Sequence, residues 1–269
     1  MATRRDKRNG MVYHARDRLL KRRLQEWEEE CARASLPQST TMSKCNMEAA
    51  VMSIGGGSLW YRGVATCLQQ YYRNVKPPVK GFEIDFFVDG MPLYKSSRSQ
   101  FWPILMKVFN VPDSPVMVVA IFCGESKPHS LEEYLRRFVE EMNDLQTNHL
   151  AIGQQLYWVC LRAIIANAPA KSFIKGVKGH TSYSACHKCT VEGQMCGHRM
   201  YFPYSTDTQE RTDELFCAGK YPDHIIRPTP LSDMINCDMI MDFVLDCMHL
   251  IDKGVLAKKW TYGLTAIQR

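Results

Sequence analysis

An α/β fold with a mixed sheet and flanking helices is what the sequence predicts, and three observations carry that prediction. Short β-prone runs at 82–88, 101–109 and 116–123 follow one another along the chain. A segment of helical periodicity comes next, and a further apolar run then covers 156–166. With 45% apolar residues among 269, the chain can bury one substantial core. We therefore expect three strands, a helix, a strand and a helix.

Two of the predicted strands end on a polar residue. The run Phe82–Val88 stops at Asp89, and Gly90 then supplies a turn. The run 156–166 stops at Asn167, after which a short helix is expected, from Ala168 or through 173–177. The run 116–123 is apolar throughout, as a central strand is. A carboxylate held at a strand end and left open by a turn suits metal binding.

The long helix of the core is predicted from its first residues. Ser130 and Glu133 have the spacing of a capping box, and apolar residues then recur at helical intervals. Upstream, the segment 59–72 is also expected to be helical, after a flexible glycine turn at 55–57. Pro37 and the polar residues around it indicate a linker, so the folded part is expected to begin near residue 50.

The positive charge of the chain is concentrated at its start. Residues 1–25 hold nine Lys or Arg residues and two Asp, a net charge of +7, against +6 for the whole chain. Such an arm contacts nucleic-acid phosphates or acts as a nuclear import signal, although a solvated charged helix is an equal alternative. The residues we expect at DNA are Arg4, Arg5, Lys7, Arg8, Lys21, Arg22 and Arg23.

Composition also predicts the cellular setting. No apolar run is long enough to cross a bilayer, and the basic start lacks the apolar segment of a secretory signal. A soluble protein with no membrane partner is expected, nuclear or otherwise cytoplasmic. Its 11 cysteines are then expected to be reduced rather than paired in disulfides.

One cysteine pair stands apart from the others. Cys186 and Cys189 have the spacing of half a tetrahedral zinc site, because two thiolates in one tight turn can hold the same ion. The other ligands must come from elsewhere, and His180, Cys196 and His198 are candidates. Two unligated thiols are the alternative, and His187 between them is expected to be exposed.

The predicted order of elements, with an acid ending the first strand, is the pattern of a ribonuclease-H-like nuclease core. Seven strings then resemble CACTA-type (En/Spm-like) DNA transposases and their animal relatives, over about residues 55–262. They are Val88–Ser97, Gln100–Leu105, Phe122–Pro128, Ala168–Ala170, Lys178–Thr181, Cys186–Cys189 and Leu245–His249. The resemblance implies DNA cleavage and strand transfer, performed by three acidic residues that hold two magnesium ions.

Asp89 matches the first acid of the family, and a turn-forming Asp-Gly pair is the alternative. Asp85, on the same strand face, is expected to be a partner or surface residue. At the second position, relatives generally have Asp-x-Pro-Ala where this chain has Asn167. A neutral amide holds two closely spaced dications poorly, so weak Mg²⁺ binding and impaired catalysis are expected. Asn167 as the cap of the following helix is the alternative.

The third acid is the least determined. Asp246 lies in a family signature that enters an apolar-periodic helix, where it is either the closing acid or a helix cap. The family takes its last acid in some cases from a more distal helix, which a chain ending at Arg269 would lack. The same signature contains His249, which by resemblance is a zinc ligand beside Cys186 and Cys189.

Four segments are therefore expected: a basic helical arm and linker (1–45), a ribonuclease-H-like core (50–177), a zinc-knuckle insertion (178–240) and a C-terminal helix (241–269). The expected cofactors are weakly bound Mg²⁺ and structural Zn²⁺. DNA is the expected partner, with a homo-oligomer left open. A transposase-derived protein with impaired catalysis is the first hypothesis. A co-opted, non-enzymatic DNA- or protein-binding module is the alternative, and a fragment without a role is a third reading.

Overall fold

The computed structural model describes residues 50–92, 99–247 and 251. The predicted basic arm and linker (1–45) lie outside the described residues, as does His249 with most of the predicted C-terminal helix. Two compact units are present: Met47–Val244 form one, and Met1–Asn46 with Leu245–Arg269 form the other. The predicted sheet and the predicted insertion thus belong to one unit.

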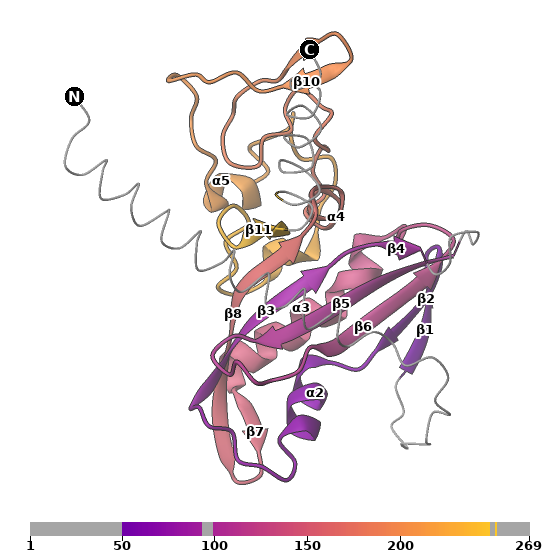
Figure 1. Cartoon of the computed structure of the whole chain (residues 1–269), viewed down its shortest axis with the longest axis vertical. Coiled ribbons are helices and arrows are strands. Elements are labelled where there is room, and N and C mark those ends of the chain that lie inside the picture. Colours follow the sequence, from indigo (N-terminus) through magenta and orange to yellow (C-terminus); the bar gives the residue numbers. More distant parts are fainter. Residues whose placement is uncertain (1–49, 93–98, 248–250, 252–269) are drawn as a thin grey trace, which may run out of the picture. The chain divides into compact units, whose positions relative to one another are not determined.

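One mixed sheet organises the larger unit, which confirms the α/β class (Figure 1). Its main path runs β1-β2-β6-β5-β3-β8-β11, with β4 paired to β5 and β7 to β8. The strands are β1 (Ala50–Ile54), β2 (Gly57–Tyr61), β3 (Gly81–Val88), β4 (Met91–Pro92), β5 (Gln100–Val108), β6 (Met117–Gly124), β7 (Leu150–Ile152), β8 (Gln155–Ala166) and β11 (Phe243–Leu245).

The three predicted core strands form an antiparallel meander. β3 pairs antiparallel with β5, and β5 pairs antiparallel with β6. β8 then returns on the other side of β3 and runs parallel to it. A parallel neighbour needs a crossover connection, and the helix α3 (Leu131–Asn148) lies in that connection. The strands expected at 82–88, 101–109, 116–123 and 156–166 are confirmed to within two residues.

The core lies between α3 and one face of the sheet, along which Figure 1 shows the helix running. The rings of Phe86 on β3 and Phe138 on α3 meet edge to face at 4.7 Å, and Tyr134 approaches Phe122 of β6 in the same manner. Ser130 caps α3 by accepting a hydrogen bond from the Glu133 backbone N–H at 3.2 Å, so the predicted helix start is confirmed.

The helix expected over 59–72 is wrong in its first part. Residues 59–61 belong to β2, which forms a hairpin with β1 around the glycine turn and pairs with β6. The helix α2 (Val64–Tyr71) begins only after Gly63, whose φ of 91° breaks the strand. Leu59 and Tyr61 are both buried because every second residue of a strand points to the same face of the sheet. An apolar run this short fits the period of a strand as well as that of a helix.

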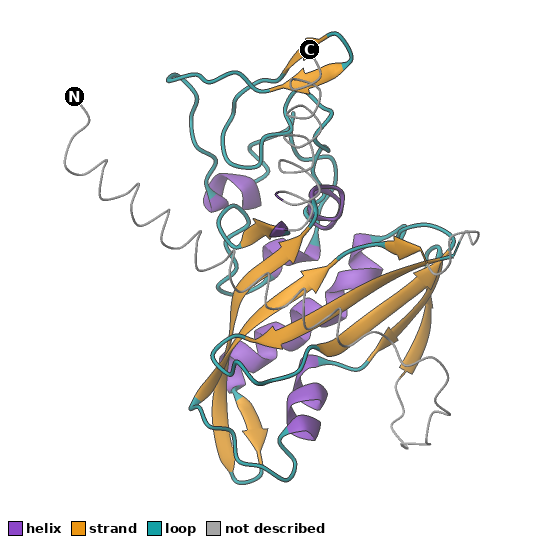
Figure 2. Ribbon diagram, viewed as in Figure 1, coloured by secondary structure: helices purple, strands orange, loops and turns teal. Residues whose placement is uncertain are grey.

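The insertion has little regular structure, and Figure 2 draws most of it as loop. It contains the hairpin β9 (Gln194–Cys196) and β10 (Arg199–Tyr201), the helix α5 (Asp213–Cys217) and the 3₁₀ helix η1 (Pro230–Asp233). The sequence also predicts a short helix around 231–235 in this irregular segment, and η1 overlaps that range. The helix expected after Asn167 is α4 (Ala168–Ile174). β11 after the insertion is a strand that the sequence patterns do not predict.

Candidate active site

Asp89 and Asn167 are neighbours in space because β3 and β8 are parallel and adjacent. The last residue pair between the strands is Phe87 with Ile165, and each strand ends shortly after it. Asp89 and Asn167 therefore leave the sheet side by side. The Asn167 side-chain amide donates a hydrogen bond from Nδ2 to Asp89 Oδ1 at 2.6 Å. Residues that lie 78 positions apart in the chain thus share one site.

The amide of Asn167 is held in one orientation. Its Oδ1 accepts a hydrogen bond from the Ala170 backbone N–H at 2.8 Å, so Asn167 caps α4. Because a backbone N–H can only donate, this bond assigns the oxygen toward Ala170 and the NH₂ group toward Asp89. The helix-cap interpretation of Asn167 is confirmed. Asp89 Oδ1 also accepts the Gly90 backbone N–H at 2.7 Å, as in a tight Asp-Gly turn.

These two side chains do not fit a pair of magnesium ions. A metal ion needs an oxygen lone pair, whereas Asn167 presents a hydrogen-bond donor to the Asp89 carboxylate. Turning the amide would orphan the Ala170 N–H and give up the helix cap. Hard dications that lie close together also require several anionic ligands, and Asn167 contributes no charge. The site is thus built around a hydrogen bond.

Asp246, the predicted third acid, directly follows β11 and belongs to the smaller compact unit. The helix that it is predicted to enter lies largely outside the described residues. Its two interpretations, closing acid or helix cap, therefore stay predictions.

Asp85 is tied into a buried ion pair. Its exposed fraction is 6%, and its carboxylate accepts two hydrogen bonds from the Arg162 guanidinium, at 2.7 and 2.6 Å. Arg162 lies at a register shift between β3 and β8 and stacks on the Phe109 ring at 3.7 Å. Asp85 is thereby confirmed as a partner residue.

Aromatic rings line the chain next to Asp89. The Trp102 ring lies so close to Gly90 that a Cβ atom added there would come within 2.5 Å of it. Trp102 in turn meets Phe173 of α4 at a centroid distance of 5.0 Å. Gly90 is therefore required for the close packing of the Trp102 ring on this turn. The Asp-Gly turn in the sequence does not by itself predict this requirement.

Cys186 and Cys189 are 3.4 Å apart at their sulfur atoms. The turn that carries them is fixed by Arg211, which donates from Nε to the Cys186 carbonyl at 3.0 Å and from its backbone N–H to the Lys188 carbonyl at 2.8 Å. Burial opposes ionisation of the Cys186 thiol, but backbone hydrogen bonds, the Cys189 side chain and the Arg211 charge outweigh it and lower the Cys186 pKa. A lowered pKa favours the thiolate that zinc requires.

Among the described residues, the predicted partners of the two thiols are not gathered around them. Within the described ranges, no group of three or more His, Cys, Asp and Glu side chains is placed to hold a metal ion. His180, Cys196 and His198 are exposed, and His249 lies outside the described residues. The zinc prediction therefore rests on the thiol pair.

Half-buried His187 and buried His224 form a ring pair that the sequence patterns do not reveal. The expectation that His187 is exposed is wrong, because its Nδ1 atom is buried and its ring meets that of His224 at 5.5 Å. Burial and the nearby Lys175 and Lys171 charges lower the pKa of His187 to about 2. Burial likewise lowers the pKa of His224 to about 4. Both rings are thus neutral in the folded protein.

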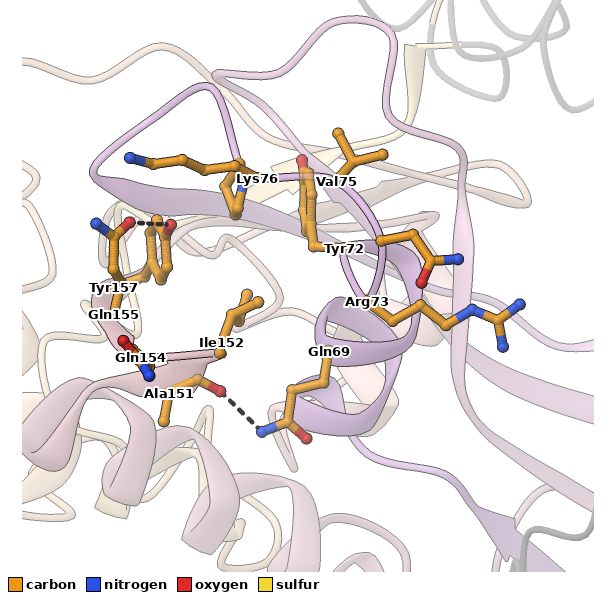
Figure 3. Close-up of a pocket in the computed structure, with 13 residues that line it drawn as sticks. Gln69, Tyr72, Arg73, Val75, Lys76, Ala151, Ile152, Gln154, Gln155 and Tyr157 are labelled. Atoms are coloured by element: carbon orange, nitrogen blue, oxygen red, sulfur yellow. Dashed lines mark hydrogen bonds between the residues drawn. The ribbon is translucent and has the colours of Figure 1, made fainter.

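A separate cavity of about 590 Å³ lies between the end of α2 and the β7–β8 hairpin (Figure 3). Its lining includes the amides of Gln69 and Gln154 and two cations, Arg73 and Lys76. It contains none of the residues that the sequence singles out. It lies near Gln155, where β8 begins, at the opposite end of that strand from Asn167.

The predicted DNA-contacting residues of the arm lie outside the described residues. Across the part of the chain that is described, no helix has the length and apolar composition needed to cross a bilayer.

Neither the comparison with known protein families nor the search of curated proteins gave a match to this chain.

Proposed function

We propose that this chain is a transposase-derived protein, related to enzymes that cleave DNA and join its strands with divalent metal ions, and that Asn167 impairs its catalysis. The proposal joins two independent supports. One is the set of seven strings in family order, from Val88–Ser97 to Leu245–His249. The other is the placement of the polar residues at the strand ends.

The sheet supports a ribonuclease-H-like core. Its central strand β3 has an antiparallel neighbour on one side and a parallel neighbour, reached through a helix, on the other. In the order β6-β5-β3-β8-β11, Asp89 follows the central strand and Asn167 follows its parallel neighbour, as the first and second acid positions of such a core would require. A nuclease that gathers its acids at one edge needs that arrangement.

The contact between Asp89 and Asn167 is the observation that carries the proposal. Positions that match the first and second acids of the family lie within 2.6 Å of each other, although the chain separates them by 78 residues. Two carboxylates at that separation would repel each other unless a cation or a proton lay between them. Asn167 is neutral and donates a hydrogen bond to Asp89, so this pair has no charge repulsion for a metal ion to relieve.

The experiment restores the missing acid and measures metal binding directly. We expect Asn167→Asp to lower the thermal midpoint in metal-free buffer, and Mg²⁺ or Mn²⁺ to raise it again, because the ion screens the new carboxylate pair. The wild type should respond little to either ion. Asn148→Asp is a matched control, since Asn148 also donates to a carboxylate, Asp144, at 2.7 Å, but on the exposed surface of α3.

Nicking of supercoiled DNA is the second readout. We expect no Mg²⁺- or Mn²⁺-dependent nicking by the wild type, and nicking by Asn167→Asp that Asp89→Ala abolishes. Robust nicking by the wild type would refute the impairment. An Asn167→Asp variant whose stability ignores both ions, like the Asn148→Asp control, would refute the metal-site ancestry of this pair.

A non-enzymatic DNA- or protein-binding module is the second candidate, and the same hydrogen bond favours it. A site that is satisfied without metal can persist for its contribution to the fold. This candidate requires metal-independent DNA binding, nuclear localisation, or self-association as a homo-oligomer, each measurable without any cleavage. Structural zinc at Cys186 and Cys189 is compatible with either candidate.

A further inference from the structure

We propose that Lys127 and Arg227 bind the phosphodiester backbone of DNA beside the Asp89–Asn167 pair. The inference rests on the proposed function for its choice of DNA as the ligand. Its geometric basis is independent, because two cationic side chains from distant parts of the chain converge on a single aromatic ring.

The ring is that of Phe173 on α4, the helix that Asn167 caps. The Lys127 ammonium lies 5.0 Å from its centroid, and the centre of the Arg227 guanidinium lies 4.9 Å from it. Phe173 also packs on Trp102, which covers Gly90 immediately after Asp89. Both cations therefore belong to the same end of the sheet as the candidate active site.

Arg227 is positioned by its backbone. The N–H groups of Ile226 and Arg227 both donate to the Gly176 carbonyl, at 2.8 and 3.2 Å, just past the end of α4. Gly176 has a φ of 66°, and a Cβ atom there would lie 2.3 Å from the Arg227 carbonyl oxygen, so only glycine allows this approach. The backbone of Arg227 is thereby fixed, and its guanidinium lies over the Phe173 ring.

Lys127 reaches the ring from the loop between β6 and α3. That loop is fixed at His129, whose backbone N–H donates to the Gly55 carbonyl at 3.0 Å. The side chain of Lys127 itself is exposed. An aromatic ring attracts a cation without using its N–H groups, so these groups stay available to phosphate oxygens.

Neither cation has an acidic partner in the described part of the chain. Among the described residues, no carboxylate forms an ion pair with Lys127 or Arg227, whereas Arg136 and Arg162 both have acidic partners. The Nε atom of Arg227 is buried and has no hydrogen-bond partner in the described part of the chain. Because this Nε atom is buried, only the terminal N–H groups of the guanidinium can reach a phosphate oxygen.

The test is DNA binding in EDTA, which excludes metal-dependent cleavage. The anisotropy of a labelled double-stranded oligonucleotide is measured with the full chain over a range of salt concentrations. For Lys127→Gln and Arg227→Gln, the slope of log affinity against log salt should fall by about 1 each, and by about 2 in the double variant. The double variant should lose on the order of tenfold or more in affinity near 0.1 M salt.

Two sets of controls separate this role from a structural one. Lys127→Arg and Arg227→Lys keep the charge and should retain the salt slope. Arg73→Gln and Lys76→Gln remove equal charges beside the cavity near the start of β8, whereas Asn167 follows the end of that strand. Because β8 has 12 residues, its two ends lie about 36 Å apart at about 3.3 Å per residue. These two variants should leave the slope within about 0.3 of the wild-type value.

The outcomes also separate this inference from the proposed function. A double variant that is folded and binds DNA with the wild-type slope overturns it, whatever the Asn167→Asp variant does with metal. If the charge-preserving variants lose binding as fully as the glutamine variants do, a structural effect is the cause and the inference is likewise overturned. Loss confined to the glutamine variants supports it even where no variant cleaves DNA.

Discussion

Lys175 shows how much chemistry a single buried residue can carry. Its side chain is fully buried, and its ammonium has no hydrogen-bond partner among the described residues, although it lies 5.2 Å from the ring centroids of Phe216 and Phe243. Burial, and then the charges of Lys171, Lys188 and Arg211, lower the pKa of Lys175 to about 7. The folded protein thus holds this amine near its neutral form at physiological pH.

The pH dependence of stability follows from that pKa. The unfolded chain keeps Lys175 protonated up to a pKa of 10.5, whereas the folded chain releases the proton near 7. Between these values the unfolded state binds more protons, so stability should rise with pH across this window. Below about pH 7, Lys175 is charged in both states, so the folded state is destabilised by the whole free energy of burying that charge.

Lys175→Met removes the charge and should remove this dependence. We expect the variant to be more stable than the wild type at pH 6, by on the order of 5 kcal/mol, and the difference to shrink as pH approaches 10. Urea unfolding at several pH values measures it. A stability difference that stays constant from pH 6 to 10 would show that Lys175 does not titrate between the two states.

The residues at the strand ends also mark where sequence reasoning succeeds. Asp89 and Asn167 are identifiable because each ends a β-prone run, and parallel strands bring such ends together. Lys127 and Arg227 are not identifiable in this way. Their meeting at Phe173 depends on the path of an irregular insertion and on the φ of Gly176, neither of which has a periodic signal.

At the scale of elements, α2 begins in an unusual manner. Its N-cap residue, Gly63, has no side chain to cap the helix. The cap comes instead from α3, where Glu141 accepts the backbone N–H groups of Val64 and Ala65 at 2.9 and 3.0 Å, and the Tyr61 hydroxyl at 2.5 Å. A carboxylate at a helix N-terminus satisfies otherwise unpaired donors and complements the helix dipole.

Gly63 is what allows Glu141 this close. Its φ is 91°, and a Cβ atom at this position would lie 2.7 Å from Glu141 Oε1. We expect Gly63→Ala to destabilise the protein by about 3 kcal/mol, from backbone strain and displacement of the cap together. Gly153→Ala is the matched control, since Gly153 has a φ of 61° but open space around it, and should cost about 1 kcal/mol.

Equilibrium unfolding in urea compares the two glycine variants. Equal losses would mean that the carboxylate cap contributes nothing beyond the backbone strain. This tertiary cap also explains why the predicted helix over 59–72 begins too early. No N-cap side chain marks the true start in the sequence, because the capping group comes from 77 residues further along the chain.

At the scale of the whole molecule, the sheet and the insertion are held together by a few polar contacts and one core. Lys171 donates from Nζ to the Phe243 carbonyl at 2.9 Å, and Thr229 donates from Oγ1 to the Ile174 carbonyl at 2.6 Å. Both contacts link α4 to the insertion or to the strand after it. The predicted boundary near residue 177 thus divides the sequence but not the compact unit.

The strands and α3 are predictable because each has a hydrophobic period and a recognisable end. The insertion is not, since its helices are five residues or shorter and its strands have three residues each. Segments this short cannot be stable alone, so their conformation depends on tertiary contacts that no local pattern records. Within the insertion, the turn that carries Cys186 and Cys189 is predictable, because the two-residue separation of the cysteines is a local pattern.

Zinc at that turn would supply the stability that such short elements lack. We expect purified protein to contain about one zinc ion per chain, as a structural site should. A chelator should lower the thermal midpoint, because metal bound only by the folded state contributes about 4 kcal/mol when its free concentration is about a thousandfold above Kd. Cys186→Ser and Cys189→Ser should remove both the zinc and the response to the chelator.

Cys217→Ser is the matched control, because Cys217 is exposed in the same insertion and contacts Asp213 rather than the thiol pair. The Cys217→Ser variant should retain zinc. The His249→Ala variant should lose zinc if His249 is a ligand, and the His180→Ala variant should lose it if His180 is a ligand. Wild-type protein without bound metal, with a melting curve that a chelator leaves unchanged, would instead assign Cys186 and Cys189 as unligated thiols. The insertion would then depend on Arg211 and its contacts with the Cys186 and Lys188 carbonyls to fix this turn.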